Sequence, residues 1–485
     1  MPPNMKRVAV IGAGIAGLAA AHQLLERSAE ANEPLEILIF ESGSRLGGII
    51  ETCERDGFLL ERGPDSFITE KPVAIQLAQR LGLESHLIQT NEKHRRSFIV
   101  RGNRLVPVPA GFQLIAPTRL WPFLNSEILS WSGKARMALD LVLPRLNING
   151  ATDESLAQFI RRRLGQEALD RVAQPMVGGI YTADPEKLSL QATMPRFIEM
   201  ERRHRSIIRA LRKRQQLPNV SDESQTQGAR YSLFVSFDRG MQLLVERLAE
   251  KLATIGIALR TRVTAVVWDM TARQWQVCAE NGPAIAVDAV CLAVPAYTAA
   301  SLLAETDVLL AAGLNQITYE STATLNLAYR RADVPHPLDG FGFVVPFVEK
   351  RSLIACTFSS VKFAGRAPQD AVLLRAFVGG AMQSELVELD DAEMTARVRA
   401  DLRDLLGIQS EPLFVEISRW RRSMPQYEVG HLARVKTIAA RVAALPGLAL
   451  AGNAYEGVGI PDCIRSGEAA AAALLTALQK PPLGH

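Results

Sequence analysis

The chain has 485 residues, of which 48% are hydrophobic and 22% charged, and its formal net charge is +4. These values are ordinary for a folded protein of two or three domains, and the mild charge does not indicate nucleic-acid binding. Five dispersed cysteines without a Cys-x-x-Cys pair argue against a zinc or iron–sulfur site, so we expect no metal and a reducing compartment.

The chain opens on a dinucleotide-binding fingerprint. Residues 8–11 form a short apolar run that leads into Gly12-Ala13-Gly14-Ile15-Ala16-Gly17 and then into an Ala/Leu-rich stretch. The glycines therefore lie between a predicted strand and a predicted helix, as the fingerprint requires. Gly12 permits the tight turn, Gly14 lets the backbone approach a pyrophosphate, and Gly17 lets the helix lie close to the sheet. The N–H groups at the helix N-terminus favour phosphate. The alternative is a glycine-rich turn without a ligand.

A second predicted strand, 35–40, is followed by Glu41 and Ser42. Glu41 comes 24 residues after Gly17, near the spacing of an acid that binds a ribose 2′-hydroxyl, and it argues against a 2′-phosphate. The next motif is Arg45-Leu46-Gly47-Gly48. It resembles the second motif of flavoproteins of the amine oxidase superfamily, which implies FAD with Arg45 near a phosphate and the two glycines under the flavin. An exposed glycine-rich turn is the alternative.

Later segments narrow the resemblance. In order, Gly63-Pro64-Asp65-Ser66 and the runs 174–189, 340–346, 377–380 and 452–463 resemble the protoporphyrinogen/coproporphyrinogen oxidases of heme biosynthesis, in particular their bacterial soluble-type branch. The resemblance covers nearly the whole chain. The alternatives are another superfamily member, such as a carotenoid desaturase or an amine oxidase, and a binding protein that keeps the fold without the flavin. The intact fingerprint argues against the binding protein, which a yellow preparation would exclude.

The predicted fold class is α/β plus α+β. We expect a discontinuous Rossmann-like FAD-binding domain over 1–70, 230–300 and 436–485, because the final strand and helix return to the fingerprint. Alternating strands and turns predict an antiparallel-sheet substrate domain over 71–106 and 301–435. Residues 107–229 are predicted to form an inserted helical domain, and its polar stretch 215–229 is predicted to be a linker.

The resemblance implies noncovalent FAD, and we expect Cys463 to be a small buried side chain rather than a flavin attachment point. The positions that match the family's motifs imply cofactor contacts from Gly12, Gly14, Ile15, Ala16, Gly17, Glu41, Ser42, Arg45, Gly47, Gly48, Gly63, Pro64, Asp65, Ser66, Val263, Trp420, Gly452, Asn453, Val458, Gly459 and Ile460.

A porphyrinogen is a large apolar ring with carboxylates at one edge, so its site should be an apolar slot with cations at one end. By resemblance, Val344 and Phe377 sandwich the ring, and Gly178 and Gly179 pass close to it. Plain core packing is the alternative for Phe377. Animal and plant members carry a propionate-binding Arg where this chain has Ser97. The bacterial branch that the chain resembles has a lysine at the position of Lys71, so we expect Lys71 to bind the substrate carboxylates, with Arg96 as a second candidate. An ordinary surface lysine is the alternative.

The expected reaction removes six electrons from the ring, two at a time, by repeated hydride transfer to flavin N5. Dioxygen reoxidises the flavin and peroxide is released. No acid–base dyad is evident in the sequence, and the resemblance implies hydride abstraction without a strong protein base. We expect protoporphyrinogen as the substrate, with coproporphyrinogen as the alternative.

We expect a cytoplasmic protein without a signal peptide or a membrane-spanning helix. Trp121, Trp131 and the basic stretch 199–214 leave peripheral membrane contact open beside ordinary burial and a solvated helix face. A homodimer and product transfer to a ferrochelatase also stay open.

Overall fold

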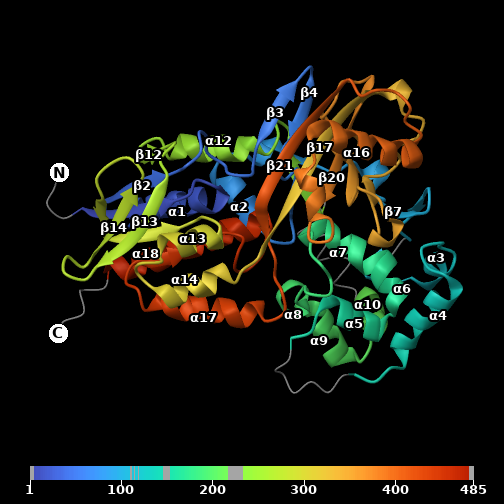
Figure 1. Cartoon of the computed structure of the whole chain (residues 1–485), viewed down its shortest axis with the longest axis horizontal. Helices are drawn as coiled ribbons and strands as arrows, with labels where there is room; N and C mark the ends of the chain where they lie inside the picture. The colour runs from blue at the N-terminus through green and yellow to red at the C-terminus, as the bar shows by residue number, and fades with distance from the viewer. Residues whose placement is uncertain are drawn as a thin grey trace.

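The computed structural model describes residues 5–109, 112–113, 115–117, 119–145, 153–216 and 233–479. Most of the predicted linker 215–229 lies outside these residues. The molecule is elongated, with a parallel sheet and its helices at one end. A second sheet and a group of helices lie together at the other end (Figure 1).

The parallel sheet has five strands in the order β12-β2-β1-β16-β22. Its strands come from distant parts of the chain: β1 (Lys6–Ile11), β2 (Leu35–Phe40), β12 (Gly256–Ala258), β16 (Ala289–Leu292) and β22 (Leu448–Leu450). Every neighbouring pair is parallel. The predicted discontinuous Rossmann-like domain is thereby confirmed as a fold.

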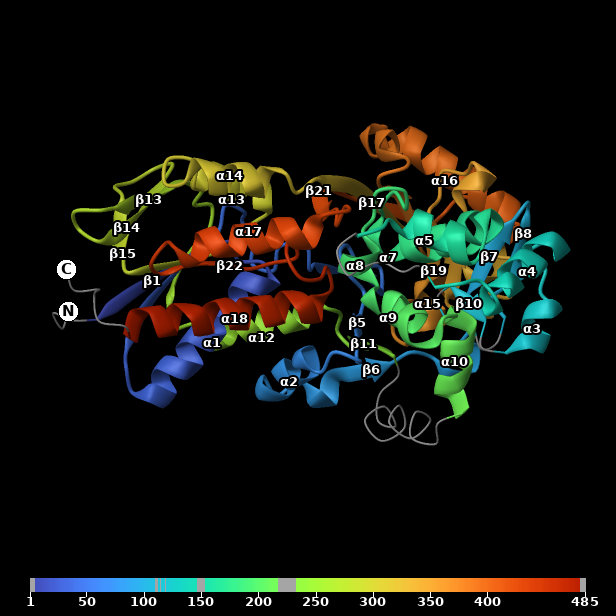
Figure 2. The same ribbon diagram turned by 90° about the horizontal axis from the view of Figure 1, so that it is seen from below.

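Helices pack on one face of this sheet and share one apolar core with it. They are α1 (Ile15–Ala31), α2 (Val73–Arg80), α12 (Gln242–Lys251) and α18 (Ile460–Gln479). Helix α18 runs alongside α1 (Figure 2). The two helices are so close at Gly467 that a Cβ there would overlap the carbonyl oxygen of Ala16. The C-terminal helix is therefore a structural part of the N-terminal fingerprint.

The other face of the parallel sheet is covered by a second core. This core contains an antiparallel three-stranded sheet, β13 (Val263–Asp269), β14 (Gln274–Ala279) and β15 (Ile285–Val287), together with α13 (Ala296–Leu302), α14 (Val308–Asn315) and α17 (His431–Ala443). Among the helices in ranges expected to belong to the substrate domain, α14 and parts of α13 and α17 pack in this second core, and α2 packs in the first core. The three-domain division stays a prediction, and its boundaries do not coincide with these cores.

The second sheet has seven strands in the order β21-β17-β20-β19-β18-β7-β8. They are β7 (Phe98–Arg101), β8 (Arg104–Pro107), β17 (Tyr319–Arg330), β18 (Gly342–Val344), β19 (Ala355–Phe358), β20 (Ala371–Gly379) and β21 (Phe414–Pro425). The pairings are antiparallel except that of β18 with β7. Helix α16 (Asp391–Leu406) covers one face of this sheet. On the other face, the side chains of Thr324 and Asn326 donate hydrogen bonds to the carbonyls of Arg62 and Glu61.

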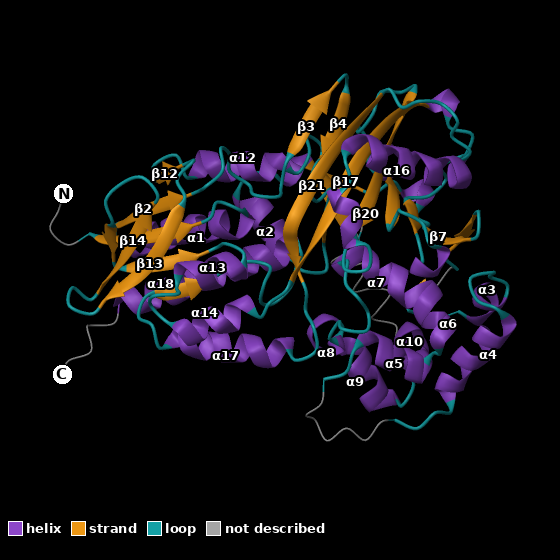
Figure 3. Ribbon diagram, viewed as in Figure 1, coloured by secondary structure: helices purple, strands orange, loops and turns teal. Residues whose placement is uncertain are grey.

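Helices dominate the inserted region, as expected (Figure 3). They are α3 (Leu120–Leu124), α4 (Trp131–Ala138), α5 (Leu156–Arg163), α6 (Gln166–Ala168), α7 (Gln174–Tyr181), α8 (Leu190–Thr193), α9 (Pro195–His204) and α10 (Ile207–Gln216). Their apolar faces form one core, in which the buried Arg163 is paired with the buried Asp140. Helix α7 carries Gly178 and Gly179 toward the seven-stranded sheet.

Short elements connect these parts. Hairpin β3 (Thr52–Arg55) and β4 (Phe58–Glu61) leads out of the fingerprint region, and β11 (Phe234–Phe237) pairs with β5 (Phe67–Ile68) and β6 (Leu87–Gln89). Other short elements are β9 (Phe112–Gln113), β10 (Ala116–Pro117) and α15 (Ser359–Lys362), besides several single turns of 3-10 or π helix. Within the described part of the chain, no helix has both the length and the apolar character needed to cross a bilayer.

Candidate active site

Several predicted cofactor residues lie at the carboxyl edge of the parallel sheet. Gly12 follows β1, Glu41 follows β2 and Gly452 follows β22, and these strands are close neighbours in the sheet. In open parallel sheets this edge is where ligands bind. The structure therefore brings together groups that lie more than 400 residues apart in the chain.

The fingerprint glycines combine a tightly packed turn with open backbone at Gly14. Gly12 has φ +98°, and a Cβ there would lie 2.5 Å from the carbonyl oxygen of Ala293. A Cβ on Gly17 would overlap the carbonyl oxygen of Gly12, so the helix lies close to the turn. At Gly14, in contrast, nothing lies within 4 Å of the Cβ position. This open backbone at the start of α1 fits the pyrophosphate of a dinucleotide.

Glu41 is held by the backbone of the same edge. Its carboxylate accepts hydrogen bonds from the N–H of Ala13 at 2.8 Å and from the N–H of Gly43 at 2.6 Å. The Ser42 hydroxyl donates to it at 3.4 Å. An ionised carboxylate has about four acceptor sites, so it can still accept ribose hydroxyls. The predicted cofactor residue Val263 follows two residues after Thr261, whose N–H donates to the Glu41 carbonyl at 2.8 Å. Val263 therefore lies near Glu41.

Arg45 shapes its own loop. Its guanidinium donates to the carbonyls of Leu46, Gly48 and Ile50 and to the Glu51 carboxylate. The loop is thereby held against the fingerprint, where a Cβ on Gly48 would lie 3.1 Å from the Cα of Gly14. The expected contact of Arg45 with phosphate stays a prediction, since both of its terminal nitrogens already have protein partners.

The segment around Gly63 lies against the seven-stranded sheet. Arg62 offers its carbonyl to the Thr324 hydroxyl at 3.1 Å and to the Trp420 indole N–H at 2.9 Å. The Gly63 carbonyl accepts a hydrogen bond from the fully buried guanidinium of Arg375. The indole of Trp420, one expected cofactor residue, therefore binds the backbone directly before Gly63, which is another. The sequence offered no signal for Thr324 or Arg375, because their partners are set by strand register.

Asp65 and Ser66 belong to a cluster of largely buried polar and charged side chains beside this segment. Lys362 donates to the Asp65 carboxylate at 2.8 Å and to the Ser66 hydroxyl at 3.2 Å. Burial alone would raise the pKa of Asp65, but the nearby Lys362 and Arg375 lower it well below its usual value. Asp65 is therefore ionised and fixes the segment that follows Gly63 and Pro64.

The two predicted ring-binding side chains stand in one row of the sheet. Val344 pairs with Ala355, Ala355 with Phe377, and Phe377 with Thr324. Residues directly opposite one another in a sheet share a face, and this is the face that contacts Arg62 through Thr324. Val344 and Phe377 are only half-buried, unlike the buried neighbours that point toward α16.

Helix α7 meets the same row. A Cβ on Gly179 would lie 3.8 Å from a methyl carbon of Val344, and one on Gly178 would lie 3.3 Å from the Gln174 side-chain nitrogen. Val344, Tyr181 and Val458 are partly buried beside the helical core. Burial raises the pKa of Tyr181 to about 12, with a smaller contribution from Asp462. The loop that precedes α18, helix α7 and strand β18 therefore lie close together. These three elements carry predicted substrate and cofactor residues.

The two predicted carboxylate-binding cations already have protein partners. Lys71 binds both carboxylate oxygens of Asp462, at 2.7 and 2.6 Å, and its side chain is 51% exposed. Arg96 is paired with Asp339 and lies at the start of β7. Asp462, in the first turn of α18, was not among the predicted site residues. Its only signal in the sequence is its place next to Pro461 in the last family segment.

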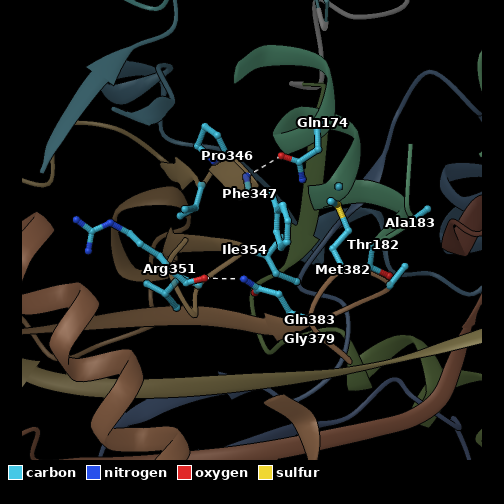
Figure 4. A pocket seen from close by; sticks show the side chains of 14 residues that line it. Gln174, Thr182, Ala183, Pro346, Phe347, Arg351, Ile354, Gly379, Met382 and Gln383 are labelled. Carbon is cyan, nitrogen blue, oxygen red and sulfur yellow. Dashed lines mark hydrogen bonds between the residues drawn. The ribbon is translucent and has the colours of Figure 1, made fainter. Parts of the chain in front are cut away.

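A pocket adjoins the predicted ring site (Figure 4). It lies between α7, the β18–β19 connection and the segment after β20, with Gly178 and Gly379 in its wall. Gln174 accepts a hydrogen bond from the Phe347 N–H at 2.9 Å, and the Gln383 amide donates to the Arg351 carbonyl at 2.7 Å. The Arg351 guanidinium is paired with Asp401 at 3.0 Å. The pocket wall therefore offers apolar surface and amide groups.

Cys463 is buried in the first turn of α18, and burial raises the pKa of its thiol to about 12. A protonated thiol is a poor nucleophile. This chemistry favours a flavin held without a covalent bond to that side chain.

Comparison with known proteins agrees with this arrangement. The family model described as "Flavin containing amine oxidoreductase" matches residues 15–475. Coproporphyrinogen III oxidase of Bacillus subtilis is 36% identical over 99% of this chain and all of that protein. Protoporphyrinogen oxidase 2 of Arabidopsis thaliana is 29% identical over 98% of this chain and 94% of that protein.

A crystal structure from Exiguobacterium sp. 255-15, of a protein provisionally identified as a protoporphyrinogen oxidase, has the same fold. Its TM-score is 0.85 at 32% identity, and the match covers 98% of this chain and all of the other. The family match spans most of the chain, and the glycine cradle at the sheet edge fits a dinucleotide. The chain therefore belongs to the flavin containing amine oxidoreductases and is an FAD-dependent oxidoreductase.

Proposed function

We propose that this protein oxidises a porphyrinogen to a porphyrin in heme biosynthesis. The observation that carries the proposal is the row Val344–Ala355–Phe377, which faces the Gly63 segment and is met by Gly179 of α7. Bound FAD supplies the two-electron acceptor that this reaction needs. The names of the relatives, which are porphyrinogen oxidases, support the same substrate class.

The proposed cofactor site is the carboxyl edge of the parallel sheet. Gly12, Gly14 and Gly17 hold the pyrophosphate, Glu41 binds ribose, and Gly47 and Gly48 lie beside the fingerprint. At the other end of the cofactor, residues 63–66 and the loop from Gly452 to Ile460 border the flavin. The N-terminus of α18 adds a positive dipole end that favours the negative charge of a reduced flavin.

The proposed substrate slot lies between the seven-stranded sheet and α7. Val344 and Phe377 offer apolar surface to the macrocycle, and the backbone of Gly178 and Gly179 passes close to it. Arg375 lies over the Phe377 ring, with its guanidinium carbon 4.9 Å from the ring centroid, and thereby restrains it. An apolar slot excludes water, and it holds the ring at one distance from the flavin through repeated two-electron steps.

For the substrate carboxylates we propose Lys71 as the binding residue. The ammonium group has three donors, two of which contact Asp462, so one remains for a substrate oxygen. Asp462 neutralises part of the charge and also holds the side chain in place. Arg96 is the weaker candidate, because Asp339 already takes its guanidinium.

Two porphyrinogens fit the proposed class. The relatives at 36% identity are coproporphyrinogen III oxidases, and the plant protoporphyrinogen oxidases are 26–29% identical. The higher identity to the coproporphyrinogen III oxidases therefore supports coproporphyrinogen III as the substrate, whereas the sequence motifs lead us to expect protoporphyrinogen.

We propose dioxygen as the final electron acceptor and a cytoplasmic location. Membrane contact at Trp121 and Trp131, which are 77% and 73% exposed, stays a prediction, as do a homodimer and transfer to a ferrochelatase.

The test is to follow porphyrin fluorescence with both porphyrinogens in parallel, using the purified FAD-loaded protein. We expect porphyrin to form with at least one of them, at a rate that falls to the uncatalysed rate when the protein is heat-denatured. A yellow protein that accelerates neither oxidation would contradict the proposed substrate. A colourless protein without releasable FAD would contradict the cofactor site.

A further inference from the structure

Tyr427 lies between the helical region and the loop that joins β22 to α18. It is 2% exposed, its side chain packs in the helical core, and its carbonyl accepts a hydrogen bond from the Ser189 N–H at 2.7 Å. Its hydroxyl donates to the Asn453 carbonyl at 2.6 Å and accepts from the Gly457 N–H at 2.7 Å. One hydroxyl therefore ties together both ends of the segment 453–457.

His431 supports Tyr427 and holds the middle of the same segment. The two rings are stacked, with centroids 4.0 Å apart and planes inclined by 12°. The His431 Nε2 lies 3.1 Å from the Tyr455 carbonyl, and because a carbonyl can only accept, Nε2 carries the proton. Burial lowers the pKa of His431, so the ring is neutral. Two side chains thus hold three backbone groups of one short loop.

The loop needs such support because its backbone is irregular. Gly452 has φ +126° and Gly457 has φ +118°, and the stretch between them belongs to no helix or strand. The loop begins at the carboxyl end of β22 and ends at the N-terminus of α18. Asn453, Val458, Gly459 and Ile460, which we propose to border the flavin, all lie in it or directly after it.

We propose that Tyr427 and His431 are positioning residues that set the shape of the segment 453–457 and thereby the affinity for FAD. The Tyr427 ring also packs against Tyr181 of α7, with centroids 6.4 Å apart, but neither Tyr427 nor His431 is among the residues proposed for the substrate slot. The proposal rests on the FAD site described above, but it does not depend on which substrate the enzyme oxidises. Tyr427 also links the core of the helical region to the segment 453–457.

The test is the substitution Tyr427→Phe, measured as FAD release from the purified holoenzyme through the recovery of free-flavin fluorescence. Removing the hydroxyl leaves the Asn453 carbonyl and the Gly457 N–H without this partner. We expect the FAD dissociation constant to rise about tenfold, the effect of one to two hydrogen bonds. We also expect a shift in the visible absorbance of the bound flavin. His431→Phe, which keeps a ring in the stack but loses the N–H, should raise the constant about threefold.

Tyr455→Phe is the matched control. Tyr455 lies in the same loop and is buried, but among the described residues its hydroxyl has no hydrogen-bond partner. We expect its FAD dissociation constant and flavin spectrum to match those of the wild type.

Thermal midpoints of the apoprotein and the holoenzyme separate positioning from general stability. If Tyr427 positions the FAD-binding loop, Tyr427→Phe should lower the thermal midpoint of the holoenzyme more than that of the apoprotein. Equal losses in both forms, an unchanged FAD dissociation constant, or an equal effect of Tyr455→Phe would overturn the proposal. If Tyr427→Phe does not fold, His431→Phe decides by the same readouts.

Discussion

Lys71 and Asp462 form an ion pair between the loop after β5 and the first turn of α18. The Asp462 side chain is 6% exposed, whereas that of Lys71 is 51% exposed. A buried carboxylate without a partner is costly, so Asp462 holds the Lys71 side chain in one orientation. The ammonium group reaches the site with its charge already partly compensated, which weakens its attraction for a substrate carboxylate.

Substitution of Lys71 therefore tests its role in substrate binding. For Lys71→Met we expect KM for the porphyrinogen to rise about threefold to tenfold, the effect of one charged hydrogen bond, with little change in kcat. Steady-state kinetics of porphyrin formation measure this. For Asp462→Asn, which releases Lys71 from its partner, we expect KM to stay constant or fall. An unchanged KM in Lys71→Met would contradict the binding role.

Asp65 has a pH-dependent effect on stability. Its pKa is lower in the folded protein than the usual value of about 3.9, so the ionised form stabilises the fold above about pH 4. That contribution is lost as the pH falls through the lowered pKa. The Asp65 side chain is 19% exposed, so we expect Asp65→Asn to lower the free energy of unfolding by only about 2 kcal/mol at pH 7.

Denaturant unfolding of the wild type and of Asp65→Asn at several pH values checks this. The difference between them should be constant from about pH 5 upward and should shrink below about pH 4. A difference that grows as the pH falls would have the opposite sign and would contradict the ionised state of Asp65.

At the scale of the elements, the packing of α1 against α18 joins the two ends of the chain. A Cβ at Gly467 would overlap the Ala16 carbonyl oxygen. Because this oxygen is a backbone atom of α1, the overlap can be relieved only if the two helices move apart. For Gly467→Ala we therefore expect a loss of about 1–3 kcal/mol in the free energy of unfolding, together with weaker FAD retention.

Gly313→Ala is the control for that substitution. Gly313 lies within α14, where the added Cβ would be 3.4 Å from the Ile438 Cγ1, an ordinary van der Waals contact. Alanine favours helix over glycine, so this variant should be neutral or slightly more stable. Urea unfolding and FAD release compare the two variants. If Gly467→Ala were as stable as Gly313→Ala, α1 and α18 would not pack as described.

Local motifs made part of this architecture predictable. Gly12, Gly14, Gly17 and Glu41 are recognisable because their spacing lies within one strand–helix–strand unit. Val344 and Phe377 could be named only by resemblance, since their common row depends on the register of β18, β19 and β20. No local pattern indicates such pairing.

Long-range ion pairs were not predictable for the same reason. Lys71 and Asp462 are 391 residues apart in the chain, and Lys362 and Asp65 are 297 apart. The departure at Ser97 drew attention to other cations, whose binding of substrate stays a prediction. The partners of Lys71 and Arg96, however, follow from how the loops are folded together, which neither composition nor spacing encodes.

At the scale of the whole molecule, three parts of the fold meet at the proposed site. The parallel sheet supplies the nucleotide cradle, the seven-stranded sheet supplies the row of Val344 and Phe377, and the helical region supplies α7 (Figure 1). Because each of these three parts contributes one wall, the proposed site forms only when all three are folded together. We therefore regard FAD and substrate binding as properties of the whole chain.

The most direct test of the central claim is the reduction of the bound flavin without oxygen. The holoenzyme is mixed anaerobically with coproporphyrinogen III or protoporphyrinogen IX, and the flavin absorbance is followed in a stopped-flow instrument. We predict that the absorbance bleaches at a rate that saturates with the concentration of at least one porphyrinogen, and that it returns when oxygen is admitted. A flavin that remains oxidised with both compounds would contradict porphyrinogen oxidation by this protein.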